Sequence, residues 1–131
     1  MAKATRAAHR HEAEGYLQAA REFQAAAEEG IARRWWRAAG SASLHAAIAA
    51  CDAVCVLYLG ERAAGANHEE AADLLQDAGA PGGPDKAKQL RAILTAKNRI
   101  EYESRAISER ESRELVKRSR RLVDWAGDTL K

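Results

Sequence analysis

The stretch of residues 97–105 carries the side chains best suited to chemistry. It reads Lys-Asn-Arg-Ile-Glu-Tyr-Glu-Ser-Arg, and its candidate binding residues are Asn98, Arg99, Glu101, Tyr102 and Arg105. A guanidinium suits phosphate because its planar fork donates hydrogen bonds in parallel and stays charged at any working pH. The stretch therefore predicts a phosphate-binding surface; the alternative is a charged helix end that only faces water.

A second group of polar residues lies beside a predicted core helix. His45 and Asp52 are seven positions apart, so both fall on one side of that helix, next to its apolar stripe. Titratable groups beside a buried stripe need partners. We expect the two either to join a structural hydrogen-bond network or to face a cleft.

The cysteines and histidines do not form a recognisable metal site. Cys51 and Cys55 lie four apart in one helical pattern, and no nearby residue completes a set of four ligands. The patterns of zinc helices, di-iron bundles, serine-hydrolase elbows and phosphate-binding loops are also missing, so no metal or cofactor is predicted. The cysteines are expected in the core, and the absence of a disulfide framework favours a reducing cytoplasm.

Basic residues alternate with indoles in the run Arg-Arg-Trp-Trp-Arg at residues 33–37. Such a run can stack on bases and hold phosphates. The alternative is that a tryptophan packs into a neighbouring helix while the arginines stay in water.

Composition and charge narrow the class of protein. The 131 residues include only two prolines and 5% aromatic residues, which favours a single helical domain. Residues 1–85 carry 8 basic and 12 acidic side chains (−4), whereas residues 86–131 carry 13 basic and 7 acidic side chains (+6). The basic half indicates a nucleic-acid face or an acidic partner, or else only a soluble helix surface. No apolar run approaches the ~18 residues that cross a bilayer, so no membrane contact is expected.

The hydrophobic pattern divides the chain into about five amphipathic segments. The first has its predicted apolar face at Tyr16, Ala20, Phe23 and Ala27 and its predicted stop at Gly30. The predicted helices are residues 11–29, residues 41–59 closed by Gly60, a short helix capped by Asn67, a helix capped by Asp85 that ends within residues 97–105, and a last helix opened by a capping box of Ser108 and Glu111. Short connections predict an all-α, antiparallel up-and-down bundle, with residues 1–10 as a candidate disordered tail.

Two passages of this pattern resemble the HEPN family of small helical bundles. One runs from Leu44 through Asp52 to Leu59-Gly60-Glu61-Arg62 and on to His68; the other is Asn98-Arg99-Ile100-Glu101-Tyr102-Glu103, followed by Ile107-Ser108. The resemblance covers about residues 16–130. It implies a homodimer whose paired clefts bind or cut RNA without metal. It also implies a place in a toxin–antitoxin pair, often beside a nucleotidyltransferase partner.

The chain departs from the family at its catalytic signature, an Arg followed after four to six residues by a His. Arg99 matches the Arg, but the positions for the His hold Ser104, Arg105 and Ala106. The general acid/base is therefore missing, and ribonuclease activity of the usual kind is not expected.

What the resemblance then implies is binding. Arg99 and Arg105 would hold phosphate, and Tyr102 would stack, donate a hydrogen bond or accept a nucleotidyl group. His45, Asp52 and His68 would line or orient the cleft.

Three functional hypotheses follow from these residues. The first is a HEPN-like dimeric module that binds RNA or a nucleotide. The second is a divergent, metal-independent ribonuclease in which His45 or His68 replaces the missing His near Arg99. The third is a protein–protein interaction bundle that docks a partner through an apolar seam including Trp35 or Trp36.

Overall fold

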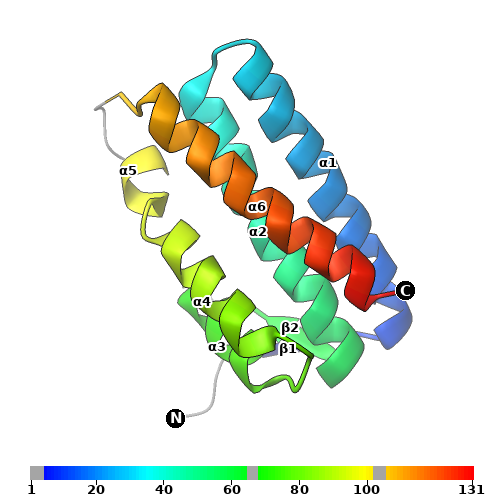
Figure 1. Cartoon of the computed structure of the whole chain (residues 1–131). Helices are drawn as coiled ribbons and strands as arrows, with labels where there is room; N and C mark the ends of the chain where they lie inside the picture. Colours follow the sequence, from blue (N-terminus) through cyan, green and yellow to red (C-terminus); the bar gives the residue numbers. More distant parts are fainter. Residues whose placement is uncertain (1–4, 65–67, 102–105) are drawn as a thin grey trace.

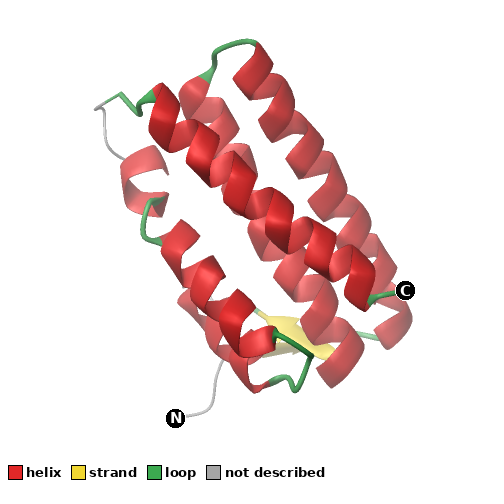
Figure 2. Cartoon of the chain, in the orientation of Figure 1, coloured by secondary structure: helices red, strands yellow, loops and turns green. Residues whose placement is uncertain are grey.

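The computed structural model describes residues 5–64, 68–101 and 106–131, with the side chain of Asn98 excepted. Within these residues the chain is an all-α bundle with one small two-stranded sheet (Figures 1 and 2). In chain order the elements are β1 (Thr5–Ala7), the 3-10 turn η1 (Arg10–Glu12), α1 (Ala13–Ala32), α2 (Trp36–Leu59), β2 (Glu61–Ala63), α3 (Glu69–Asp77), α4 (Gly83–Leu94), α5 (Lys97–Glu101) and α6 (Glu109–Thr129).

The long helices alternate in direction, as the sequence predicts. Figure 1 shows α1 and the α4–α5 pair running one way, with α2 and α6 running the other. The core is built from small and aliphatic side chains of every helix; its largest fully buried members include Leu44, Leu75, Leu90 and Leu122. The predicted antiparallel, up-and-down helical bundle is therefore confirmed.

Helix α2 lies at the centre of the bundle, and its apolar run is longer than the sequence prediction states. By length and composition alone it is long and apolar enough to cross a membrane, which corrects the expectation that no segment approaches this limit. However, 67% of its apolar window is buried inside the bundle, against α1, α3 and α6. That packing accounts for its composition as a core helix.

Helix α1 buries only part of the predicted face. Ala20 and Ala27 are buried as predicted, but Leu17 and Gln24 are buried as well, whereas Phe23 is 41% exposed, so the expected apolar position at Phe23 is wrong. Gln24 takes the inner position because its amide Nε2 donates to the Val116 carbonyl of α6 at 3.1 Å. A buried amide is tolerated when it is hydrogen-bonded in this way.

The α1–α2 connection is also shorter than predicted. Gly30 does not stop the first helix, which continues to Ala32. Its role is in packing, because the lack of a side chain lets Ala39 of α2 approach closely. A Cβ on Gly30 would lie 3.0 Å from the Ala39 Cβ. The turn is made instead at Arg34, whose φ is 62°, and α2 begins at Trp36 rather than at residue 41.

The predicted fourth helix is divided into α4 and α5. Its start is Gly83, with Gly82 as N-cap at φ 77°, so the predicted cap at Asp85 is wrong; Asp85 lies in the first turn. The helix ends at Leu94 and resumes at Lys97. Arg37 of α2 then donates from its guanidinium to the carbonyl oxygens of Arg99 and Ile100, near the end of α5.

The three remaining helix-end predictions have different outcomes. The Ser108 Oγ accepts a hydrogen bond from the Glu111 backbone N–H at 3.1 Å, and Gly60 ends α2 in the left-handed region, so both of these predictions are confirmed. The predicted cap at Asn67 lies outside the described residues, and α3 begins at Glu69.

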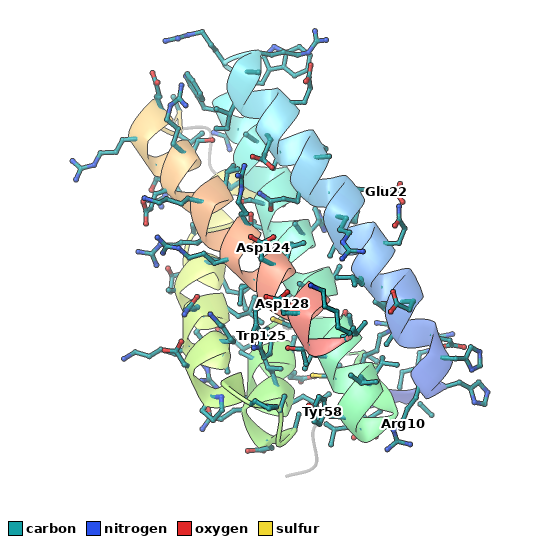
Figure 3. All side chains as sticks on the ribbon, turned by 45° about the vertical axis from the view of Figure 1, so that its right-hand side comes forward. Arg10, Glu22, Tyr58, Asp124, Trp125 and Asp128 are labelled. Carbon is teal, nitrogen blue, oxygen red and sulfur yellow. The ribbon has the colours of Figure 1, made fainter. Side chains whose placement is uncertain are left out.

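The N-terminal segment is paired rather than a free tail. Residues 5–7 form β1, which pairs antiparallel with β2, Thr5 opposite Ala63. Arg10 donates from Nε to the Leu57 carbonyl at 3.0 Å, and Figure 3 shows Arg10 at the end of α2 that carries Tyr58. The predicted disordered tail is therefore wrong for residues 5–10, because backbone and guanidinium donors attach them to the end of α2.

Candidate functional site

Arg99 faces a groove between α4–α5 and α6. Its guanidinium forms an ion pair with the Glu111 carboxylate of α6, and its side chain is 32% exposed. Its Nε is buried and has no hydrogen-bond partner among the described residues. The groove has a volume of about 810 Å³, and its charged lining residues are Arg99, Arg110, Glu111, Glu114 and Arg118. A ligand that enters this groove would therefore meet three guanidinium side chains and two carboxylates.

The exposed side of α6 continues this basic surface beyond the groove. The segment of residues 117–121 contains four basic residues and no acidic one. Some of the α6 arginines are neutralised by carboxylates: Arg113 by Glu109, Arg118 by Glu114 and Arg120 by Glu28 of α1. Arg110, Lys117 and Arg121 form no ion pair with any described residue. The hydrogen bond from Arg118 is the largest cause that lowers the pKa of Glu114, and the positive charges of Lys117 and Arg121 lower it further through space.

A second groove lies on the other side of α6, against α1. It has a volume of about 490 Å³, with Ile31 and Val116 as apolar lining residues. Its charged lining residues are Glu28, Arg113, Lys117, Arg120 and Arg121. Helix α6 therefore lies between two grooves, each with more basic than acidic lining residues.

The two predicted histidines lie near the opposite side of α5. Burial is the largest cause that lowers the pKa of His68, followed by the positive charge of Lys97 and the proximity of His45, while Glu101 opposes the shift. Glu101 accepts a hydrogen bond from the Ser41 hydroxyl at 3.1 Å. His45 is exposed and stacks on Phe23, with 5.2 Å between ring centroids.

Asp52 is buried in a small pocket that is distinct from the two grooves beside α6. The pocket has a volume of about 100 Å³, and its lining residues are Ile48, Asp52, Arg62, Ala63, Ala64, His68 and Ala71. Burial raises the pKa of Asp52 from 3.8 to about 7, and the positive charge of Arg62 partly opposes that shift. The structure thus places Asp52 and His68 in one pocket, with His45 close enough to His68 to affect its pKa.

Arg99 is not brought together with either histidine. Successive helical residues are about 100° apart, so Arg99 lies about 200° around α5 from Lys97, whereas Glu101 falls on the Lys97 side. Lys97 and Glu101 affect His68, while Arg99 pairs with Glu111 of α6. The geometry required for a histidine to replace the missing catalytic residue beside Arg99 is therefore absent from the described residues.

The rest of the predicted stretch is only partly described. Tyr102 and Arg105 lie outside the described residues, as does the side chain of Asn98. Among the described residues, no group of three or more His, Cys, Asp or Glu side chains is arranged to hold a metal ion. Cys51 and Cys55 are buried in the core. Burial is the largest cause that raises the pKa of the Cys51 thiol, and the neighbouring Cys55 and Asp52 raise it further.

The indole run has a structural explanation. Trp36 is half-buried between the guanidiniums of Arg34 and Arg113, whose carbon atoms lie 5.2 and 5.4 Å from its ring. Trp35 is 56% exposed beside Arg33. Among the described residues, the other exposed large aromatic side chains are Phe23 and Tyr58. Trp35 precedes the first residue of α2, Tyr58 lies near the last residue of α2, and Phe23 lies in the middle of α1, so at ~1.5 Å per helical residue the three lie at different levels of the bundle. They therefore form no common apolar patch.

Sequence reasoning missed Arg62 and Glu111 as functional partners. The sequence indicates a role for Arg62 only through the family resemblance, yet its side chain crosses to α1, where Nε donates to the Tyr16 hydroxyl at 2.9 Å. Glu111 was assigned only to a capping box, but it also pairs with Arg99. Neither contact has a signal in the sequence, because each joins residues that are distant along the chain.

Comparison of the chain with protein-family models, curated proteins and solved structures gives no match in any of the three. The HEPN resemblance consequently rests on the residues named above, and the function must be inferred from the geometry of α5, α6 and the pocket of Asp52.

Proposed function

We propose that this chain is a HEPN-like RNA-binding module that holds the phosphate backbone along α6 and in the α5–α6 groove. The observation that carries the proposal is the exposed side of α6, on which Arg110, Lys117 and Arg121 have no ion-pair partner among the described residues. Phosphates would replace the solvent around these cations and release counterions. The partly exposed side chain of Arg99 lines the adjoining groove and adds a further positive charge there.

The surrounding carboxylates favour binding of a flexible single strand over a rigid duplex. Glu109, Glu111 and Glu114 interrupt the basic surface at the start of α6. A single strand can follow the positive positions and avoid the negative ones, which a duplex of fixed phosphate spacing does less well. A free nucleotide, the other ligand considered from the sequence, would occupy only the groove at Arg99.

The family resemblance supplies the remaining parts of the proposal. A homodimer in the cytoplasm, membership of a toxin–antitoxin pair and a nucleotidyltransferase partner are proposed on that ground. We do not propose a ribonuclease, because Arg99 and the histidines are held on different sides of α5.

The test is the binding of a labelled single-stranded RNA, followed by fluorescence anisotropy over a series of salt concentrations. Three phosphate contacts predict a slope of log K against log salt of about −2, at about −0.7 for each contact in a single strand. The Lys117→Gln/Arg121→Gln variant should weaken binding at least about tenfold and reduce the slope by about 1.4. RNA recovered after incubation in EDTA should be intact.

The matched control is the Lys86→Gln/Lys88→Gln variant, which removes the same charge from α4. It should bind within about twofold of the unmodified protein, because only general electrostatic attraction is reduced. Equal losses in the two double variants, or binding insensitive to salt, would contradict the proposal. Cleaved RNA would restore the ribonuclease hypothesis instead.

A further inference from the structure

The pocket around Asp52 has the properties of a built ligand site. Asp52 is 8% exposed, and it forms no hydrogen bond or ion pair with any described residue. Buried carboxyl groups are almost always paired, since leaving one unsatisfied costs several kcal/mol. The carboxyl lines a cavity of about 100 Å³, so a group entering that cavity would meet an acceptor with no competing partner.

Arg62 supplies the opposite charge on the wall of the same cavity. Its Nε is held by the Tyr16 hydroxyl, its Nη1 donates to the Ala63 carbonyl at 3.2 Å, and its guanidinium lies over the Tyr16 ring at 5.6 Å. These contacts fix the guanidinium in place while its Nη2 makes no described contact. Asp52 and Arg62 interact through space but form no ion pair, so the cavity has a carboxyl group on one wall and a guanidinium on another that do not bind each other directly.

We propose that this pocket binds a small α-amino acid as its zwitterion, with the ammonium group on Asp52 and the carboxylate on Arg62. An α-amino acid carries its two charges on adjacent atoms, so one small molecule satisfies both walls. The remaining lining residues include Ile48, Ala63 and Ala71, which suit a hydrogen atom or methyl group as the ligand side chain. The volume excludes large side chains.

Other ligand classes fit these walls less well. A metal ion would find only the Asp52 carboxyl and the His68 imidazole, and three or more such ligands do not converge within the described residues. A simple cation would be repelled by Arg62, and a simple anion would leave the Asp52 carboxyl unsatisfied or require it to be protonated. A molecule that carries both a positive and a negative group can bind Asp52 and Arg62 at the same time.

The surroundings of Asp52 link binding to protonation. Among the described residues, Arg62 of β2 and His68 before α3 line the pocket with Asp52, and Cys51 lies beside it on its own helix. An ammonium group binds the ionised carboxyl, and burial holds the pKa of Asp52 at about 7 in the empty pocket. Ligand binding should therefore release a proton below neutral pH and strengthen as the pH rises to about 8.

The experiment is titration of the full chain with glycine and with L-alanine, followed by two-dimensional NMR at a pH of about 8. We expect saturable shifts of the amide signals of Ile48, Asp52 and Ala71, with millimolar affinity as befits so small a ligand. Methylamine and acetate carry only one charged group each and should bind at least about tenfold more weakly. L-tryptophan should not bind, because the cavity cannot hold an indole.

Variants separate this site from a general effect of charge. Asp52→Asn and Arg62→Gln should each weaken alanine binding at least about tenfold, and Arg62→Lys provides a second test if the Gln variant does not fold. Asp124→Asn, on the exposed side of α6, is the matched control and should bind normally. Absence of saturable shifts with either amino acid, or equal binding of acetate and alanine, would overturn the proposal.

Discussion

Replacing Asp52 with Asn should stabilise the protein above neutral pH. Asp52 is buried, and burial raises its pKa in the folded protein from 3.8 to about 7. Since the folded-state pKa lies above the unfolded value, folding favours the protonated acid. The stability that this group contributes is fully present below pH 3.8 and is lost as the pH rises through about 7.

The expected magnitude follows from the size of the shift. About three pKa units at about 1.4 kcal/mol each correspond to roughly 4 kcal/mol between the acid and alkaline limits. Between pH about 5 and pH about 8, the unmodified protein should lose roughly 2–3 kcal/mol of unfolding free energy relative to Asp52→Asn, because an amide does not ionise. All other titrating groups are common to both proteins and cancel in this difference.

The assay is urea unfolding of both proteins at the two pH values, without added ligand. Asp124 is exposed on α6 (Figure 3) and provides the matched control, since its carboxylate is hydrated in both folded and unfolded chains. Asp124→Asn should therefore change unfolding free energy with pH in parallel with the unmodified protein. A parallel curve for Asp52→Asn as well would refute the reasoning that Asp52 is buried without a partner.

Two further predictions concern the positions that shape the helices. Gly30→Ala should destabilise the protein by about 1–3 kcal/mol in urea unfolding, because the new Cβ would crowd Ala39. Gly15→Ala places its Cβ where no neighbouring element lies within 4 Å, so it should stabilise the protein by about 0.5–1 kcal/mol. A lower unfolding free energy for both variants would contradict this reasoning. Ser108→Ala should lower the unfolding free energy by about 1 kcal/mol, measured in the same way, since the Glu111 N–H loses its cap; no change would show that the cap contributes nothing.

The bundle could be predicted because its strongest signals are local. The apolar faces of α3 and α4 follow from helical periodicity, and the Ser108 cap follows from residue types three positions apart. The errors arise where a distant contact changes the outcome. Glycine is common at helix ends, but Gly30 remains helical because it packs against Ala39. Gln24 has the type of an exposed residue, but the Val116 carbonyl of α6 holds it inside.

The candidate site was predictable in its residue types and not in its grouping. The spacing of His45 and Asp52 places both beside the core stripe, yet only Asp52 is buried, because His45 extends towards the exposed ring of Phe23. The pairing of β1 with β2 has no strong signal, since each strand has only three residues. Without it, the position of Arg62 beside Asp52 cannot be anticipated.

Helix α5 explains why the chain presents two separate surfaces. Ile100 anchors it in the core, and Arg37 binds the carbonyl oxygens near its end, so its rotation about its own axis is fixed. With that rotation fixed, Arg99 must face α6 while Lys97 and Glu101 face His68. RNA held along α6 and an amino acid held by Asp52 would thus contact different side chains, so the loss of one activity need not affect the other. The fixed orientation of α5 therefore separates Arg99 from the histidines, although the sequence alone places all of them in a single predicted site.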